Sequence, residues 1–403
     1  METMIGIILG VVIPPSHRLG VRMVRLSSRL SSIGTGFAKY FQKPPEDVIR
    51  LTIGEPDLDT PGAISEAAIA ALRDGQTHYS RSLGLERTTR AVSTHLSRGG
   101  LEVDPDDIMI TNGAKQALFS AMLAIGDPGQ SMIIPSPAWA SYNPQLKVCG
   151  LHPIHVPLDQ RLHLDIPAIE AAIDDTTAAI IVNSPNNPTG SVYTAEELTS
   201  LVEVAIEHDL WLISDEIYAS MVWLDDRNHI PIASLPGAKN RTVTIGGWSK
   251  GWAMTGWRLG WIAGPSSLID HVSVVQANTV THPPTFLQIG AAVALEDETL
   301  VEEVITPFRE RRSLVLKRLQ AMPNIVVPEL EGAFYAFIDI RPTGLSDLEF
   351  VDRLLSEARV QVIPGSLMPF GEGWVRLSYT ASTEDLIEGL DRMESWLHDL
   401  DSS

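Results

Sequence analysis

The sequence of 403 residues contains a single cysteine, Cys149, which excludes an intramolecular disulfide and any metal site built from several cysteines. We predict that Cys149 is a small, buried hydrophobic side chain. The eleven histidines show no spacing typical of metal ligands, so no metal site is predicted. A chain with so few thiols is typical of a reducing compartment, and we expect a cytoplasmic protein.

Basic residues are scarce: 30 lysines and arginines stand against 50 aspartates and glutamates, which gives a net charge of −20. Such a surface repels nucleic acids and anionic membranes, so we expect neither as a partner. An anionic substrate would therefore need a locally basic pocket. The hydrophobic content of 44% is ample for a large core, and the length is typical of two or three domains.

Long hydrophobic runs are also missing. The apolar run at residues 5–13 is much shorter than the roughly 20 residues that span a bilayer. It also lacks the basic segment that opens a signal peptide. We therefore expect no membrane span, and we interpret residues 1–22 as a disordered extension or as the result of a wrongly assigned start codon.

The rest of the chain alternates between helix and strand patterns, without repeats or low-complexity tracts. This alternation predicts an α/β fold with a mainly parallel, seven-stranded sheet flanked by helices. The predicted strands cover residues 108–111, 131–134, 153–156, 178–183, 211–215, 242–246 and 259–263. Helices are predicted at residues 63–73, 85–98 and 115–125, and capping boxes at residues 194–197 and 382–385 open two more.

After about residue 302 the pattern changes. A long helix to about residue 320 precedes short strand patterns at residues 332–339, 360–363 and 375–379, with a helix between them. This order of elements predicts a second, smaller α+β domain.

The segment from Gly247 to Arg258 carries the most informative combination of residues. Lys250 lies in a Gly-Trp-Ser-Lys-Gly-Trp setting, and Arg258 follows eight residues later. A lysine amine can condense with an aldehyde, and an arginine fork can neutralise a phosphate through two hydrogen bonds. Pyridoxal phosphate carries both groups on one ring. Taken alone, the segment would more simply hold a solvated lysine and a surface arginine.

Two polar segments directly follow apolar runs: residues 183–190 (Asn-Ser-Pro-Asn-Asn-Pro-Thr-Gly) and residues 214–218 (Ser-Asp-Glu-Ile-Tyr). Both therefore lie at carboxyl ends of predicted strands, where open α/β sheets bind ligands. Together with Lys250 and Arg258, these segments resemble the class I/II aminotransferases of the large pyridoxal-phosphate fold, in the subgroup with the aspartate and aromatic amino acid aminotransferases of bacteria and archaea. The resemblance runs from about residue 26 to about residue 396.

The resemblance implies a role for each residue around the cofactor ring. Lys250 would bind the cofactor covalently, and Asp215 would stabilise the proton of the ring nitrogen. Tyr218 and Asn187 would both reach the ring hydroxyl. Trp139, in Ser-Pro-Ala-Trp, would stack on the ring, although a core tryptophan is the alternative. Asn187 and Trp139 would also contact the substrate. The predicted catalytic residues are Lys250, Asp215 and Tyr218.

The cofactor phosphate is predicted to lie at the start of a helix. Ala114 and Lys115 follow a strand and open this helix, so their N–H groups can bind phosphate with the help of the helix dipole. Arg258 and Ser249 would complete the phosphate site. Similar aspartate-specific enzymes often have a serine three positions before the lysine, whereas this chain has Gly247, which leaves more of the phosphate binding to the other groups.

The resemblance also implies a homodimer with shared active sites. Tyr79, in Thr-His-Tyr-Ser, matches a tyrosine that crosses to the phosphate of the neighbouring subunit, and residues 278–286 would lie near the partner's pocket. A large cofactor-binding domain would span residues 61–302, and residues 23–60 would form the small domain together with residues 303–403. The peptide bonds before Pro137 and Pro188 are predicted to be cis.

For the substrate, the resemblance implies that Arg376, in Val-Arg-Leu-Ser-Tyr, clamps the α-carboxylate of an amino acid beside the backbone of Gly54. Lys115 matches a lysine able to meet the distal carboxylate of aspartate; a solvated lysine is the alternative. Apolar rings would rest against Trp139 and Phe37.

These residues predict an aminotransferase that moves an amino group from aspartate or glutamate to a 2-oxo acid such as 2-oxoglutarate. Lys250 would act as general base and acid at the substrate Cα. Aromatic amino acids are the alternative substrates, and a β-lyase or racemase of the same fold would use the same residues. A cofactor-sensing transcription regulator would need a DNA-binding domain and a basic face, and the sequence has neither.

Overall fold

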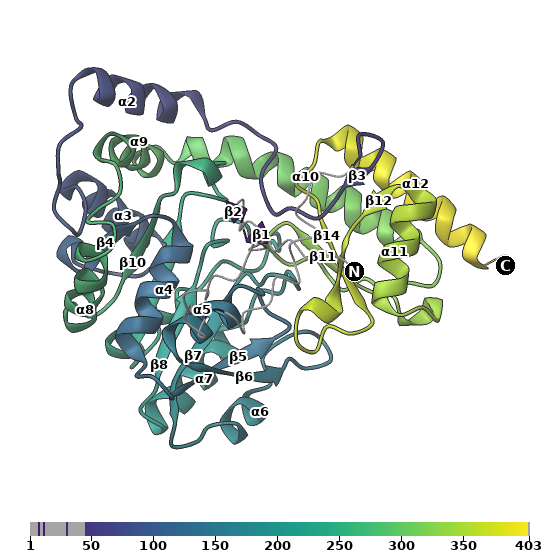
Figure 1. Cartoon of the computed structure of the whole chain (residues 1–403), viewed down its shortest axis with the longest axis horizontal. Coiled ribbons are helices and arrows are strands. Elements are labelled where there is room, and N and C mark those ends of the chain that lie inside the picture. Colours follow the sequence, from purple (N-terminus) through teal and green to yellow (C-terminus); the bar gives the residue numbers. More distant parts are fainter. Residues whose placement is uncertain (1–6, 9–10, 13–29, 31–44, 402–403) are drawn as a thin grey trace, which may run out of the picture.

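The computed structural model of the chain describes residues 7–8, 11–12, 30 and 45–401 (Figure 1). At its centre lies a seven-stranded sheet with the order β4-β10-β9-β8-β7-β5-β6. β10 runs antiparallel to both of its neighbours, and the other pairs are parallel, so the predicted mainly parallel sheet is confirmed. Its strands are β4 (Ile108–Thr111), β5 (Ser131–Ser136), β6 (His152–Pro157), β7 (Thr177–Asn183), β8 (Trp211–Asp215), β9 (Thr242–Gly247) and β10 (Gly260–Ala263).

Side chains of this sheet are buried on both of its faces. Successive residues of a strand point to opposite faces, and here Ile134 packs with Ile181 and Ile245, whereas Ile133 packs with Ile180 in a different part of the core. Burial on both faces explains why the strands read as continuous apolar runs in the sequence. The surrounding helices are α2 (Gly62–Arg73), α3 (Glu86–Arg98), α4 (Ala114–Ile125), α5 (Tyr142–Cys149), α6 (Ile166–Ala171), α7 (Ala195–Glu207), α8 (Ser266–Ala277) and α9 (Thr285–Glu296).

The C-terminal part forms a smaller antiparallel sheet with the order β11-β14-β13. Its elements are β11 (Tyr335–Asp339), β13 (Ile363–Pro364), β14 (Trp374–Ser378), α10 (Thr299–Ala321), α11 (Asp347–Ala358) and α12 (Thr383–Asp401). In Figure 1, the long helix α10 extends from the region of α9 to that of α12.

The strand predicted at residues 360–363 is divided in the structure. β12 (Val360–Gln361) pairs with β3 (Ile49–Arg50) in parallel, whereas β13 pairs with β14. The two halves diverge because each has a different partner strand. The pairing with β3 places the chain around residue 50 beside the C-terminal part.

Several local predictions are confirmed. The hydroxyl of Thr194 accepts the N–H of Glu197, whose carboxylate in turn accepts the N–H of Thr194, so the capping box of α7 is complete. Cys149, the last residue of α5, is buried. The bonds before Pro137 and Pro188 are cis, and so is the bond before Pro185, which was not predicted.

Little of the N-terminal segment is described. β1 (Ile7–Ile8) and β2 (Val11–Val12) pair with each other in an antiparallel arrangement. The prediction for Phe37 and most of the prediction for residues 1–22 concern residues outside the described part. Among the described residues, no helix combines the length and the apolar character needed to cross a membrane.

Candidate active site

The predicted site residues gather at one edge of the large sheet. β7 ends at Asn183, β8 at Asp215 and β9 at Gly247, and these three strands are parallel neighbours. Their carboxyl ends therefore meet at the same edge, from which the next residues of each segment continue.

Lys250 lies three residues beyond the end of β9. Its ammonium Nζ donates a hydrogen bond to the carbonyl oxygen of Gly54 at 2.5 Å. Burial lowers the pKa of Lys250 to about 8; Glu55 opposes this shift, and the positive charges of Arg258 and Arg376 add to it. A lysine with such a pKa is partly neutral near physiological pH, as a nucleophile or proton acceptor must be.

Asp215 is buried at the end of β8. The phenol of Tyr142 donates a hydrogen bond to Asp215 Oδ2 at 2.7 Å, and the side-chain amide of Asn183 donates one to the backbone carbonyl oxygen of Asp215 at 2.8 Å. Burial raises the pKa of Asp215 to about 6, against the effect of the hydrogen bond from Tyr142. The carboxyl is therefore mostly ionised at neutral pH and suited to hold a positively charged N–H group.

Arg258 lies against the first turn of α4. A Cβ atom added to Gly113 would lie 2.8 Å from Arg258 Nη2, and one added to Gly260 would lie 2.5 Å from the backbone nitrogen of Ala114. Glycines at both positions let the arginine and β10 approach the helix start closely. The first N–H groups of a helix have no partner within it, so the N–H groups of Ala114 and Lys115, together with Arg258, are suited to bind an anion.

Arg376, in β14, is buried. Its Nη1 donates to Asn187 Oδ1 at 3.0 Å and its Nη2 to the carbonyl of Thr52 at 2.8 Å, while its guanidinium carbon lies 4.6 Å from the centre of the Tyr335 ring. Among the described residues, the buried Nε has no acceptor. A buried guanidinium with an unused N–H is a good indication of a missing anionic ligand.

Three tyrosines lie in this region. Tyr218 was predicted as a site residue, whereas Tyr142 and Tyr335 were not. Tyr218 was expected to face a cofactor, and its hydroxyl lies 2.9 Å from that of Tyr335. Tyr335 also touches Gly54: a Cβ atom there would lie 1.8 Å from the Tyr335 hydroxyl oxygen. Tyr335 and Tyr142 were not predicted as site residues because Tyr335 lies in a strand and Tyr142 in a helix, where a tyrosine is usually interpreted as a core residue.

Lys115 is directed to the site rather than to solvent. Its Nζ lies 4.9 Å from the centre of the Trp139 ring, and Trp139 in turn meets Tyr142 edge to face. Burial and the charge of Arg258 lower the pKa of Lys115. Lys115 is thus partly buried beside another predicted site residue, and its role at a distal carboxylate stays a prediction.

Two other predicted site residues, Ser249 and Tyr79, differ in their exposure to solvent. Ser249 is buried next to Lys250. Tyr79 is 89% exposed, and its ring meets His282 edge to face, in the stretch that was expected near a partner subunit. Within the described residues the structure brings Tyr79 to no other predicted site residue.

One group of possible metal ligands lies outside this site. The ligand atoms of Glu170, Glu207 and His208 lie within 4.8 Å of one another where α6 meets the end of α7. The sequence did not reveal this group because Glu170 comes from another helix. All three residues are exposed, and we assign no ion to them.

The fold and site together have the features of an enzyme that holds a phosphorylated aldehyde: a lysine, a buried carboxylate and a helix start with an arginine at the carboxyl edge of an α/β sheet. Residues 46–393 match the family described as aminotransferase class I and II. The chain belongs to this family of pyridoxal-phosphate-dependent enzymes and is an aminotransferase.

Similar proteins include enzymes named for two kinds of substrate. The chain is 42% identical to an aspartate aminotransferase of Pyrococcus abyssi over 88% of this chain and 92% of that protein. It is 41% identical to the aromatic-amino-acid aminotransferase 2 of Thermococcus litoralis, over 87% and 92%. The structure of the Thermus thermophilus aspartate aminotransferase with maleate matches with a TM-score of 0.87 and 36% identity, covering 93% of this chain and 100% of that chain.

Proposed function

We propose that this aminotransferase accepts aspartate and glutamate as amino donors and 2-oxoglutarate as an acceptor, with aromatic amino acids as a second donor class. The observation that carries this proposal is Lys115 beside Trp139, which offers a cation and an apolar ring in one place. The names of the similar enzymes from Pyrococcus abyssi and Thermococcus litoralis support both donor classes.

The residues present fit pyridoxal phosphate. Lys250 supplies an amine for its aldehyde, and the buried Asp215 supplies a carboxylate for its ring nitrogen. The start of α4, Arg258 and Ser249 supply a phosphate site. Asn187 and Tyr218 would face the ring hydroxyl, and Trp139 would cover the ring. When bound, the cofactor supplies an electron sink for the bond that breaks at the substrate Cα.

Lys250 moves the proton in this mechanism. With a pKa of about 8, its amine would be able to accept a proton from the substrate Cα as general base and to donate it again as general acid. Burial, together with the neighbouring positive charges of Arg258 and Arg376, keeps part of the Lys250 population neutral. The carboxylate of Asp215 would hold a protonated ring nitrogen of the cofactor.

Arg376 and Gly54 orient the substrate. The buried guanidinium of Arg376 can bind the α-carboxylate in a two-pronged manner, with Asn187 already hydrogen-bonded to it. The Gly54 carbonyl accepts a hydrogen bond from the Lys250 ammonium, so the proposed base lies beside the backbone that would approach the α-carboxylate. Orientation of the Cα–H bond toward the base lowers the barrier for proton transfer.

We also propose a homodimer with shared sites, in the cytoplasm. The support is the pairing of the exposed Tyr79 with His282 and the exposed apolar side chains Leu123 of α4 and Val274 of α8, two helices that pack together. A second copy of the chain is the partner that would cover them.

A donor panel tests the proposed reaction. Purified holoenzyme is assayed with 2-oxoglutarate and aspartate, phenylalanine or tyrosine, and glutamate formation is measured together with ammonia and D-amino acids. We expect glutamate from both donor classes. Ammonia or D-amino acid as the main product would instead identify a β-lyase or a racemase.

A further inference from the structure

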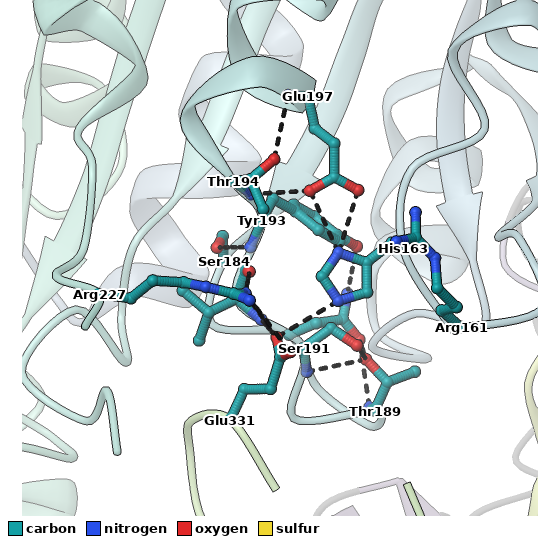
Figure 2. A network of polar contacts seen from close by, with 12 residues as sticks. Arg161, His163, Ser184, Thr189, Ser191, Tyr193, Thr194, Glu197, Arg227 and Glu331 are labelled. Atoms are coloured by element: carbon teal, nitrogen blue, oxygen red, sulfur yellow. Dashed lines mark hydrogen bonds and ion pairs between the residues drawn. The ribbon is translucent and has the colours of Figure 1, made fainter. Parts of the chain in front are cut away.

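His163 lies between two carboxylates in a cluster that we call the His163 cluster: His163, Glu197, Glu331 and Arg227 (Figure 2). The His163 Nδ1 atom is 3.0 Å from Glu197 Oε1, and its Nε2 atom is 3.3 Å from Glu331 Oε2. The side chains of His163, Glu197 and Glu331 are only 10–13% exposed. Because each ring nitrogen faces a carboxylate oxygen, the arrangement favours a doubly protonated, positively charged imidazolium ring.

The two carboxylates belong to different parts of the fold. Glu197 completes the capping box of α7, beside the large sheet. Glu331 precedes β11 of the small sheet, and its Oε2 accepts the N–H of Val192 at 2.8 Å. Arg227 lies 3.3 Å from the other oxygen of Glu331. His163 therefore joins the large sheet to the segment that enters the small sheet.

This segment and the loop ending at Val192 both reach the active site. The loop carries Asn187, and the segment continues into Tyr335. The two pack directly on each other: a Cβ atom on Gly190 would lie 3.1 Å from the carbonyl oxygen of Gly332 and 3.3 Å from that of Tyr335. A shift of Glu331 would therefore move both Asn187 and Tyr335.

We propose that charged His163 is a positioning residue of the aminotransferase, which holds Glu331 against the large sheet and so fixes Asn187 and Tyr335 around the substrate. The inference rests on the proposed site positions of these two residues, and it is independent of which amino acid is the donor.

The surroundings of His163 are dominated by acidic groups. Glu197 from α7 and Glu331 face its ring nitrogens, Asp159 of its own loop accepts its backbone N–H at 2.9 Å, and the ring of Tyr193 meets it edge to face. Two cations lie further out: Arg227 pairs with Glu331 at 3.3 Å, and Arg161, two residues before His163, pairs with Asp159 at 3.1 Å. The acidic groups closest to the imidazolium thus stabilise its charge.

The pH range of the effect follows from these contacts. Burial would lower the pKa of His163, but hydrogen bonds to Glu197 and Glu331 outweigh burial and raise the pKa to about 9. A group whose folded pKa is raised stabilises the fold fully below its ordinary value, and this stabilisation is lost as the pH rises through the folded pKa. His163 therefore positions the site at neutral pH and releases it above about pH 9.

The test combines a direct titration with a substitution that keeps the charge. Holoenzyme labelled with ¹³C at the histidine Cε1 atom is titrated by NMR, and His163→Gln assigns the signal. In parallel, kcat/KM of wild type and His163→Arg is measured from about pH 7.5 to about pH 10. We expect a His163 pKa near 9 and a ratio of wild type to His163→Arg that falls by about tenfold over this range. The control is His152→Arg, the same change at an exposed histidine. The ratio of kcat/KM of wild type to that of His152→Arg should stay constant over this pH range.

Two results would overturn the proposal: titration of His163 below its ordinary value, or a constant ratio despite a pKa near 9. If His163→Arg does not fold, Glu331→Gln replaces it, because loss of this carboxylate should lower the His163 pKa and shift the alkaline fall of kcat/KM to lower pH. An unshifted fall would refute the positioning role. Absence of transamination in wild type would instead refute the proposed function.

Discussion

At the scale of single residues, Lys115 bears most directly on substrate choice. Its ammonium is held over the Trp139 ring, and burial lowers its pKa. An ion pair between a partly buried Lys115 and the distal carboxylate of a substrate would contribute about a few kcal/mol to binding. This is enough for a preference for acidic donors but not for exclusive specificity.

We therefore expect Lys115→Met to lower kcat/KM for aspartate by about tenfold or more and to spare phenylalanine. Steady-state kinetics with both donors measure this difference. Lys239→Met, at an exposed lysine, is the control. Equal losses for both donors would mean that Lys115 serves the phosphate or the fold.

Tyr142 is expected to tune Asp215. Its phenol donates to Asp215 Oδ2 and opposes the rise of the Asp215 pKa that burial causes. Tyr142→Phe removes this donor, so the Asp215 pKa should rise above about 6, and the acid limb of the pH profile of kcat/KM should move to higher pH. Cofactor affinity at neutral pH should fall by about tenfold.

The matched control for this change is Tyr379→Phe, which removes another buried hydroxyl, one that donates to the Ala333 carbonyl instead. It should leave the acid limb in place. If Tyr142→Phe also leaves the acid limb of the kcat/KM profile and the cofactor affinity unchanged, the acid limb does not reflect the titration of Asp215.

At the scale of elements, the junction of β10 and α4 is the proposed anion site. A methyl group at Gly260 would lie 2.5 Å from the Ala114 nitrogen, so Gly260→Ala must push β10 away from the helix start. We expect a loss of about 1–3 kcal/mol of stability and weaker binding of pyridoxal phosphate, measured by thermal unfolding and by fluorescence titration. Gly62→Ala, with nothing within 4 Å of the added carbon, should be neutral or slightly stabilising. Unchanged cofactor affinity in Gly260→Ala would argue against this anion site.

The sequence predicted the elements of the large sheet well because most of its strands are buried on both faces and therefore show as apolar runs. It predicted Lys250, Asp215 and Arg376 as site residues through their motifs. It did not reveal Tyr142 and Tyr335, since the importance of their hydroxyls depends on partners distant in the sequence.

Long-range pairing also explains the other differences. Residues 360–363 belong to two strands because the first half pairs with β3 and the second half pairs with β14. Glu197 was recognised as a capping residue, but its second partner, His163, lies in another loop, and local patterns do not report such contacts. The domain boundaries near residues 60 and 302 stay a prediction.

At the scale of the whole molecule, the proposed dimer makes a specific prediction for mixed subunits. If Tyr79 serves the neighbouring site, a hybrid of a Lys250→Ala subunit and a Tyr79→Phe subunit contains one site with both native residues. We expect refolded mixtures of the two inactive variants to be more active than the average of the parents. Activity equal to that average would show that each site is built from one chain.

Charge is distributed unevenly over the molecule. The chain has a net charge of −20, yet the cations that act on Lys250 are Arg258, Arg376 and Lys115. Three cations of the kind that an anionic substrate requires thus lie near Lys250. Dicarboxylates should bind more weakly as salt is added, because screening acts on these charges.

The central claim is that Lys250 holds the cofactor at this edge. Borohydride reduction of the purified holoenzyme, followed by proteolysis and mass spectrometry, locates the lysine bound to pyridoxal phosphate. The account predicts a pyridoxyl group on Lys250, on the peptide that follows β9. A label on Lys115 or Lys239, with Lys250 unmodified, would contradict it.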